Sequence, residues 1–397
     1  MQREEKIFHL AQKYRDETAT NLSNLVKIKS LSRQEKGVIK ELTRQMETAG
    51  FDEVWVDPLG NAIGRIGSGK KILAIDAHMD TVDVGNLEDW EFDPFGGEIK
   101  DGYVLGRGSV DQEGGAAAFV TAGRILKELG LDKELTVYFV GSVMEEDCDG
   151  LPWKFIIEED KIRPDFAIST EPTNLNIYRG HRGRMEIEVA FHGLSAHASA
   201  PERGKNAIYM ASRACLEIEA LNDRLKVDDF LGKGSVAVTE FVSRSPSLCA
   251  VADYARIHLD RRLTWGETKD SAVAEVAEIV KGLDARIDVL QYEETAYTGR
   301  KYGMEKYFPT WKMPEDHPVV QVGVEAFREL FHSEPKVDKW TFSTNGVVIN
   351  GVYGIPMIGF GPGNEVLAHA PNEKVPVEHL VKASAFYAAY AFKIAEI

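Results

Sequence analysis

Residues 70–82 constrain the fold of this chain more than any other segment. Their first half is short, apolar and partly β-branched, with charge in front of it, which is typical of a buried parallel strand. His78 and Asp80 stand at the carboxyl end of this run. In an open α/β sheet, ligand sites form at the carboxyl ends of the strands. A histidine there can bind a metal ion and donate its other N–H to a carboxylate, although a single His-x-Asp triplet is a weak signal.

Two further apolar runs end in acidic residues. Residues 135–144 run directly into Glu145 and Glu146, and residues 165–170 end on Glu171. Clustered carboxylates repel one another and are costly to desolvate unless a cation holds them. Three strands that each end in histidine or acid therefore favour a metal site over a purely structural role. For Glu145 and Glu146, the alternative is a solvated acidic turn.

Asp111 and His369 extend this set from two loops. Asp111 follows a glycine-rich segment and precedes an alanine-rich helix that ends at Gly130, so a helix cap is the alternative to a metal ligand. His369 belongs to the loop of residues 367–373. No single member of the set is decisive, but together its members lie on strand ends and loops of one predicted sheet edge.

The middle of the chain has a different character. From about residue 182 the predicted elements follow the order β-α-β-β-α-β, which is that of a ferredoxin-like unit. The flanking segments predict an α/β fold with a mixed, mostly parallel sheet flanked by helices. A chain of 397 residues is long enough for two such domains. We therefore predict a catalytic domain of residues 1–181 and 295–397, with an inserted lid or dimerisation domain of residues 182–294.

Charge and cysteine content exclude some partners and favour one compartment. A formal net charge of −16 disfavours binding to nucleic acid or to an anionic membrane surface. No apolar run approaches the roughly 18 residues of a membrane helix, and no apolar signal core follows the charged first residues. Three sparse cysteines without metal-ligand spacing fit a reducing compartment, so we expect a cytoplasmic protein.

In their order, these motifs resemble the M20 family of metallopeptidases and deacylases. That family includes glutamate carboxypeptidases, acetylornithine deacetylase, succinyl-diaminopimelate desuccinylase and aminoacylases. The matching motifs are His-x-Asp from 78, Gly-Arg-Gly-x-x-Asp ending at 111, Glu-Glu from 145, Glu-Pro from 171 and His-x-Pro-Asn-Glu from 369. Five ordered motifs over nearly the whole chain make the resemblance specific. Residues 259–268 also resemble the YgeY-type branch, often labelled selenium-metabolism-linked hydrolases.

The resemblance implies two divalent metal ions as cofactors. Asp111 would bridge them. His78 and Glu171 would complete the ligands of one ion, and Glu146 and His369 those of the other. Mixed histidine and carboxylate ligands suit zinc first, with manganese or cobalt as alternatives.

The resemblance also implies three further catalytic residues. Asp80 would orient the His78 ring, and Glu145 would be the general base toward the attacking water. His197, in the predicted lid, would reach the active site of a partner subunit and stabilise the oxyanion of the tetrahedral intermediate. That role implies a homodimer formed through the inserted domain. The alternative is a histidine that caps the loop before a helix.

The substrate contacts implied by the resemblance come from the lid and from late turns of the chain. Arg262 matches the arginine that binds the substrate carboxylate, a task suited to a bidentate guanidinium. Arg261 beside it is expected to be a surface or interface charge. Asn345, Gly361 and Gly363 would supply polar and backbone contacts around the ligand.

We therefore predict a metal-dependent hydrolase that cleaves an amide-type C–N bond in a small carboxylate-bearing substrate. A peptide, an N-acyl amino acid or an N-carbamoyl amino acid would fit. Trp265 and the turn at 343–346 depart from the family pattern where specificity is set, so the sequence does not choose among these substrates. The alternative is a catalytically silent small-molecule-binding protein that keeps the fold, which the complete set of ligands and the Glu145 base disfavour.

Overall fold

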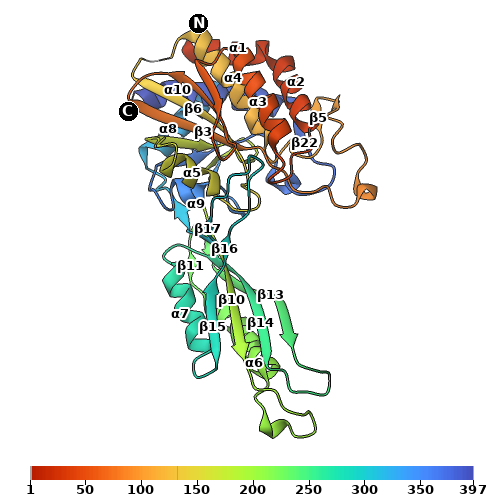
Figure 1. Ribbon diagram of the computed structural model, residues 1–397. Coiled ribbons are helices and arrows are strands. Elements are labelled where there is room, and N and C mark those ends of the chain that lie inside the picture. Colours follow the sequence, from red (N-terminus) through yellow and green to blue (C-terminus); the bar gives the residue numbers. More distant parts are fainter. Residues whose placement is uncertain (1, 132, 397) are drawn as a thin grey trace.

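Two separate hydrophobic cores organise the chain in the computed structural model, which describes residues 2–131 and 133–396. The larger core gathers buried residues from 7–178 and 292–394, and the smaller one gathers residues from 185–280. Figure 1 shows the smaller body as an elongated extension that points away from the larger one. The predicted domain boundaries near 182 and 294 remain a proposal, and the outer limits at residues 1 and 397 lie outside the described residues.

An eight-stranded mixed sheet forms the centre of the larger body, in the order β1-β2-β6-β3-β7-β21-β8-β20. The strands are β1 (Glu53–Val56), β2 (Ala62–Gly67), β3 (Lys71–His78), β6 (Leu135–Ser142), β7 (Phe166–Ser169), β8 (Ile177–Tyr178), β20 (Val337–Asp338) and β21 (Met357–Gly359). The inner strands β6, β3, β7 and β21 are parallel, whereas β1, β2 and β6 pair antiparallel. The predicted α/β class with a mixed, mostly parallel sheet is confirmed.

Helices enclose this sheet. They are α1 (Arg3–Lys13), α2 (Arg15–Val26), α3 (Lys36–Thr48), α4 (Glu113–Leu129), α5 (Leu151–Glu158), α8 (Pro318–Phe331), α9 (Gly346–Ile349) and α10 (Val377–Ala395). Every residue of β3 from Leu73 onward is buried. Because successive strand residues point to opposite faces, both faces of the sheet must be covered. Among the described residues, no helix is both long and apolar enough to cross a membrane.

The helices differ in places from the sequence prediction. The helical spacing of apolar residues over about 4–28 predicts one continuous helix, but the structure divides it at Tyr14 into α1 and α2, and the Tyr14 ring packs against the Arg124 guanidinium, 4.2 Å from the ring centroid. The short helix α5 was not predicted. Its apolar residues are all buried, and a buried helix of this length cannot be distinguished from a strand by periodicity.

A five-stranded antiparallel sheet forms the smaller body, in the order β13-β14-β10-β15 with β18 also paired to β10. Its elements are β10 (Gly183–His192), α6 (Ala207–Arg224), β13 (Ser235–Arg244), β14 (Tyr254–Leu263), α7 (Lys269–Ile279), β15 (Ala285–Val289) and β18 (Tyr307–Phe308), with a small hairpin of β11 (Val227–Asp228) and β12 (Gly232–Lys233). Without that hairpin, the order up to β15 is the predicted β-α-β-β-α-β. Strand β18 lies beyond residue 294, so the returning link adds a strand to this sheet.

Short strands connect the two bodies and complete the larger one. Strand β9 (Gly180–His181) pairs with β19 (Trp311–Lys312), and β16 (Gln291–Tyr292) pairs with β17 (Met304–Glu305). The His181 Nε2 accepts hydrogen bonds from the Trp311 indole at 2.7 Å and from the Thr344 N–H at 3.2 Å. Burial lowers the pKa of His181 to about 4, so its ring is a neutral acceptor that joins the outgoing strand, the returning strand and the loop at 344.

Candidate active site

The predicted ligands converge at the carboxyl edge of the central sheet. His78 is the last residue of β3, and Glu171 follows the end of the neighbouring strand β7. Asp111 precedes α4, and His369 follows the short helix η3 (Glu365–Leu367). The five predicted ligands and the predicted base line one cavity of about 330 Å³: His78, Asp111, Glu145, Glu146, Glu171 and His369.

Asp111 lies between the two histidines. Its Oδ1 is 2.9 Å from His78 Nε2, and its Oδ2 is 3.3 Å from His369 Nε2. Each carboxylate oxygen therefore faces a different imidazole, as a bridging ligand requires. Glu171 Oε1 is 3.8 Å from His78 Nε2, and Glu146 Oε1 is 3.0 Å from His369 Nε2. The side chains thus form two adjoining groups that share Asp111.

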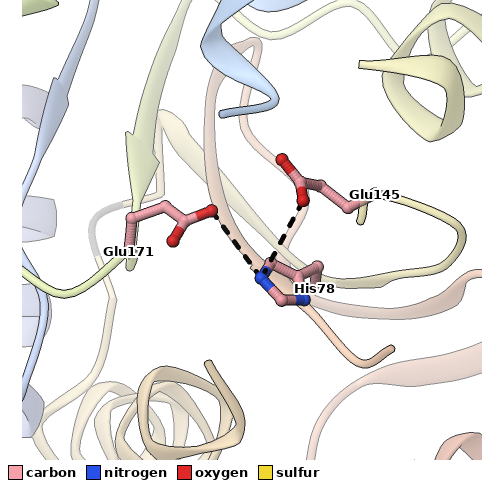
Figure 2. Close-up of side chains that lie close together, drawn as sticks. All are labelled: His78, Glu145 and Glu171. Atoms are coloured by element: carbon pink, nitrogen blue, oxygen red, sulfur yellow. Dashed lines mark ion pairs between the residues drawn. The ribbon is translucent and has the colours of Figure 1, made fainter. Parts of the chain in front are cut away.

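Two buried carboxylate groups each direct one oxygen at the His78 ring. Figure 2 shows the carboxylates of Glu145 and Glu171 directed at the same ring nitrogen, and Glu145 Oε2 is 4.0 Å from it. Their other oxygens, Glu145 Oε1 and Glu171 Oε2, are buried and accept no hydrogen bond from the residues that the structure describes. Such oxygens are costly in a protein interior unless a cation compensates them. This donor set fits divalent cations, and the potential ligand atoms of His78, Glu145 and Glu171 lie within 4.8 Å of one another.

The two histidines provide the positive charge among these carboxylates. Hydrogen bonds to Asp111 and Glu146 raise the pKa of His369 to about 10. Burial opposes a charge on His78, but the bond to Asp111 and the charges of Glu145 and Glu171 outweigh it and raise the pKa well above the usual value. Metal ligation requires neutral imidazoles, so cation binding must release protons from this cluster.

Asp80 is fully buried beneath His78. Its carboxylate accepts hydrogen bonds from the backbone N–H groups of Glu145 at 3.1 Å and Glu146 at 3.0 Å, and from the Ser32 hydroxyl at 2.6 Å. His78 Nδ1 is 2.8 Å from the backbone carbonyl oxygen of Asp80 and 3.7 Å from its Oδ1. Asp80 therefore contacts both the ring of one predicted ligand and the turn that carries the two glutamates.

A second arginine, which the sequence did not single out, faces the cavity beside Arg262. Arg184 on β10 pairs in register with Arg262 on β14, and both line the cavity. Arg262 donates to both carboxylate oxygens of Asp260 at 2.7 and 2.9 Å, and Arg184 Nη2 donates to Asp149 Oδ1 at 3.2 Å. Directly opposed like charges are unfavourable without such partners. The lining residues that sequence reasoning missed are Asp149, Arg184, Phe342, Glu365 and Ala368.

The prediction that Arg261 is a surface or interface charge is wrong. Arg261 is 1% exposed, and its Nη2 lies 2.6 Å from Glu267 Oε1 and 3.1 Å from Glu275 Oε2. Neighbouring residues on a strand point to opposite faces, so Arg261 points away from the cavity that Arg262 lines. Its ion pairs hold β14 to Glu275 in the middle of α7 and to Glu267, which lies just before that helix.

Three of the predicted substrate contacts are not among the described residues that line the cavity. The Asn345 side chain is 1% exposed and donates to Asp76 Oδ2 at 2.9 Å. Gly361 passes so close to the end of β7 that a Cβ would meet the carbonyl oxygen of Glu171 at 2.1 Å, and Gly363 has a φ of +85°. Within the described residues, none of these three lines the cavity. Their contact with a substrate stays a prediction.

His197 lies far from the cavity of its own chain. It belongs to the loop between β10 and the short helix η2 (Pro201–Arg203), and Figure 1 shows this loop at the end of the smaller body farthest from the central sheet. The extended strand from Arg184 to His192 spans about 26 Å at roughly 3.3 Å per residue. The His197 ring accepts hydrogen bonds from the N–H and the hydroxyl of Ser199.

Comparisons with known proteins match this geometry. The model for the peptidase family M20/M25/M40 matches residues 74–393. The uncharacterized protein YgeY of Escherichia coli strain K12 is 50% identical over 385 residues, which cover 96% of each chain. Acetylornithine deacetylase of Proteus mirabilis is 25% identical and aligns over 85% of this chain and 84% of its own length. The crystal structure of aminopeptidase PepT from Bacillus cereus has a TM-score of 0.73 and 24% identity, and covers 96% of this chain and 99% of that chain.

Proposed function

Because this chain belongs to the peptidase family M20/M25/M40, we propose that it cleaves an amide-type C–N bond in a small carboxylate-bearing substrate with two divalent metal ions. The resemblance seen in its sequence motifs is confirmed, and the chain is a hydrolase of this family. One observation carries the proposal. Asp111 presents its two oxygens to two different histidines, at 2.9 and 3.3 Å, within a cluster of buried carboxylates.

This arrangement supports one assignment of the ligands to the two ions. His78 and Glu171 would hold one ion, Glu146 and His369 the other, and Asp111 would contact both. We propose zinc as the metal because the ligands mix imidazole nitrogen and carboxylate oxygen, and manganese or cobalt would accept the same ligands. Bound at such a site, divalent ions acidify water to a pKa of about 7 and polarise the scissile carbonyl.

We assign the general base to Glu145. Burial raises the pKa of this carboxyl group, and the neighbouring charges of Asp149 and Glu171 add to the shift. A carboxylate with a raised pKa is suited to take a proton from the attacking water and to pass it to the leaving nitrogen. Asp80 supports this role because it accepts the backbone N–H of Glu145 at 3.1 Å. In this assignment Asp80 is a positioning residue.

Arg262 and Arg184 are the groups that we assign to the substrate carboxylate. Both line the cavity that contains the metal-ligating side chains. Arg262 uses its Nε and Nη2 on Asp260, so its Nη1 is available to a substrate anion. An anion bound there would neutralise charge between two opposed guanidinium groups.

We propose that His197 acts in the active site of a partner subunit, as an oxyanion donor. Its distance from the cavity of its own chain supports this proposal, and so does the exposed edge strand β13, whose residues 240–244 are all open to solvent. An uncovered strand edge is a site at which a second chain can pair. A homodimer through the lid would bring His197 to the other active site, and closure of the lid would exclude water from it.

We propose the cytoplasm as the compartment. All three cysteines are free thiols, and Cys148 and Cys215 are wholly or partly buried. Disulfides are rare where glutathione and thioredoxin keep thiols reduced, so unpaired cysteines support this compartment. The net charge of −16 supports small-molecule substrates rather than nucleic acid.

A substrate panel on metal-defined protein tests the function. Protein stripped of metal and reloaded with zinc, manganese or cobalt is assayed on dipeptides, N-acyl amino acids and N-carbamoyl amino acids, with product analysis. We expect turnover in the reloaded protein alone, and the products separate an exopeptidase from a deacylase or a ureido-hydrolase. Binding of these compounds without turnover by protein that holds two ions would instead favour the silent binding protein.

A further inference from the structure

Arg107 and Glu373 belong to two of the five motifs but have no part in the chemistry described above. Arg107 is 3% exposed and Glu373 is fully buried. Arg107 Nη1 donates to Glu373 Oε2 at 2.6 Å. A buried ion pair loses the hydration of both charges, and it is stable only if further hydrogen bonds satisfy the remaining groups. The partners of those remaining groups indicate what the pair does.

Glu373 directs its second oxygen at the backbone of the predicted bridging ligand. Glu373 Oε1 accepts the N–H of Val110 at 2.7 Å and the N–H of Asp111 at 3.0 Å. Hydrogen bonds to an ionised carboxylate are shorter and stronger than neutral ones. Glu373 therefore fixes the backbone from which the Asp111 side chain reaches both histidines.

Arg107 directs two further hydrogen bonds at the loop of the predicted ligand His369, and its Nη2 also donates to the carbonyl of Asp83 at 3.4 Å. Its Nη1 donates to the carbonyl of Ala370 at 3.2 Å, and its Nη2 to the carbonyl of His369 at 3.4 Å. The guanidinium also packs over the Trp90 ring, 5.2 Å from the centroid. His369 has a φ of +60°, a left-handed conformation that is unfavourable for a residue with a Cβ. Bonds to the carbonyls of His369 and Ala370 hold the loop in this conformation.

The ligands of the two proposed ions differ in how they are held. His78 is the last residue of β3 and Glu171 follows β7, and their side chains are 1% and 3% exposed. The His369 side chain is 54% exposed and is carried by a loop. The first pair is therefore positioned by the sheet itself, whereas His369 depends on contacts that its loop makes with other segments.

We propose that the Arg107–Glu373 pair is a positioning device that holds Asp111 and His369 at the spacing one metal ion requires. This inference rests on the proposed function, since it presupposes a two-ion site. It assigns the pair to the ion between Asp111, Glu146 and His369. The ion held by His78 and Glu171 depends on it much less.

Metal titration of the full-length, metal-free protein tests this inference without any substrate. Zinc affinity is measured by calorimetry against a competing chelator, and cobalt binding by its visible absorption. In Arg107→Met, we expect one of the two ions to bind about 10–100-fold more weakly, the usual effect of losing a residue that orients a metal ligand. The other ion shares Asp111 with this site but does not use His369, so its affinity should fall clearly less.

Arg261→Met is the matched control. It removes a second buried ion pair, Arg261 with Glu267, whose closest atoms are also 2.6 Å apart and which lies in the lid away from the ligands. Both zinc affinities should be unchanged in this variant. If Arg107→Met does not fold, Glu373→Gln is used instead. It keeps the shape of the side chain but removes its charge, and we expect the same selective loss.

The outcomes separate this inference from the proposed function. Two ions of wild-type affinity in Arg107→Met or Glu373→Gln would overturn the positioning role alone. Equal weakening of both ions, or the same weakening in Arg261→Met, would also overturn it. Wild-type protein that binds no divalent ion would overturn the proposed function and this inference with it.

Discussion

Metal binding should become tighter as the pH rises, because the histidines of the cluster are protonated without metal. Asp111 and Glu146 raise the pKa of His369 to about 10, and the pKa of His78 is also raised well above 6.5. An incoming ion must therefore displace a proton from each imidazole that it binds. Each displaced proton contributes about one log unit of affinity per pH unit.

The size of the pH dependence follows from the number of protonated imidazoles that each ion displaces a proton from. The ion at His369 should show a slope of about one log unit per pH unit at neutral pH, falling to zero only as the pH passes the histidine's raised pKa. The ion at His78 should show a similar slope. Two ions bound together at pH 7 should therefore release about two protons from the imidazoles, and protonated carboxylates can add to that number.

The stability of the metal-free fold changes with pH in the opposite direction to metal affinity. A histidine whose pKa is raised in the folded state stabilises that state fully below its unfolded pKa near 6.5. For His369, this contribution is lost as the pH rises from 6.5 through about 10. Raising the pH should thus weaken the metal-free fold in this window while it strengthens metal binding.

Calorimetry in buffers of different ionisation enthalpy measures the number of protons released at each pH. His369→Asn is the matched variant, since it removes one of the two imidazoles and should reduce the proton count by about one at pH 7. Zinc binding at pH 7 without proton release would refute the argument. So would a wild-type proton count in His369→Asn, because it would show that His369 is not protonated in the metal-free protein.

Three further predictions concern single side chains. Glu145→Gln should lower kcat by about 10²–10⁴-fold while two ions stay bound, because it removes the proposed base and keeps the shape; wild-type turnover would contradict the assignment. Arg184→Met should raise KM for substrates with a free carboxylate by about 10-fold or more, because a charge-assisted hydrogen bond is lost. Arg256→Met, on the same strand as Arg262 but paired with Glu188, is its control and should leave KM unchanged. Arg261→Met should destabilise the protein by about 3–5 kcal/mol, because it leaves Glu267 buried without its partner; urea unfolding within 1 kcal/mol of wild type would contradict the buried pair.

Short-range sequence patterns were sufficient to predict the central sheet and the side chains at its edge. An apolar run that stops at a polar residue marks a strand end, and the carboxyl ends of parallel strands meet at one edge. His78, Glu145 and Glu171 could be predicted together because each lies within a few residues of such an end. The predicted helices and lid elements also follow from short-range periodicity. The family motifs then supplied Asp111 and His369, which lie in loops.

Contacts between distant segments decided which arginines are buried and which line the cavity, and periodicity could not predict this. The alternation of β14 predicts that Arg261 and Arg262 face opposite ways, but only the packing of α7 shows which of them is buried. Arg184 gives no local signal, because its importance comes from the register of β10 with β14 and from the turn at Asp149.

The same limit applies to the proposed positioning pair. The sequence by itself determined which residue types stand at 107 and 373, and that both belong to motifs. Only the tertiary structure brings these two positions, 266 residues apart, into a 2.6 Å contact. The physical reason is that strand and helix patterns arise from neighbours within a few residues, whereas a buried charge needs a partner from wherever the folded chain provides one.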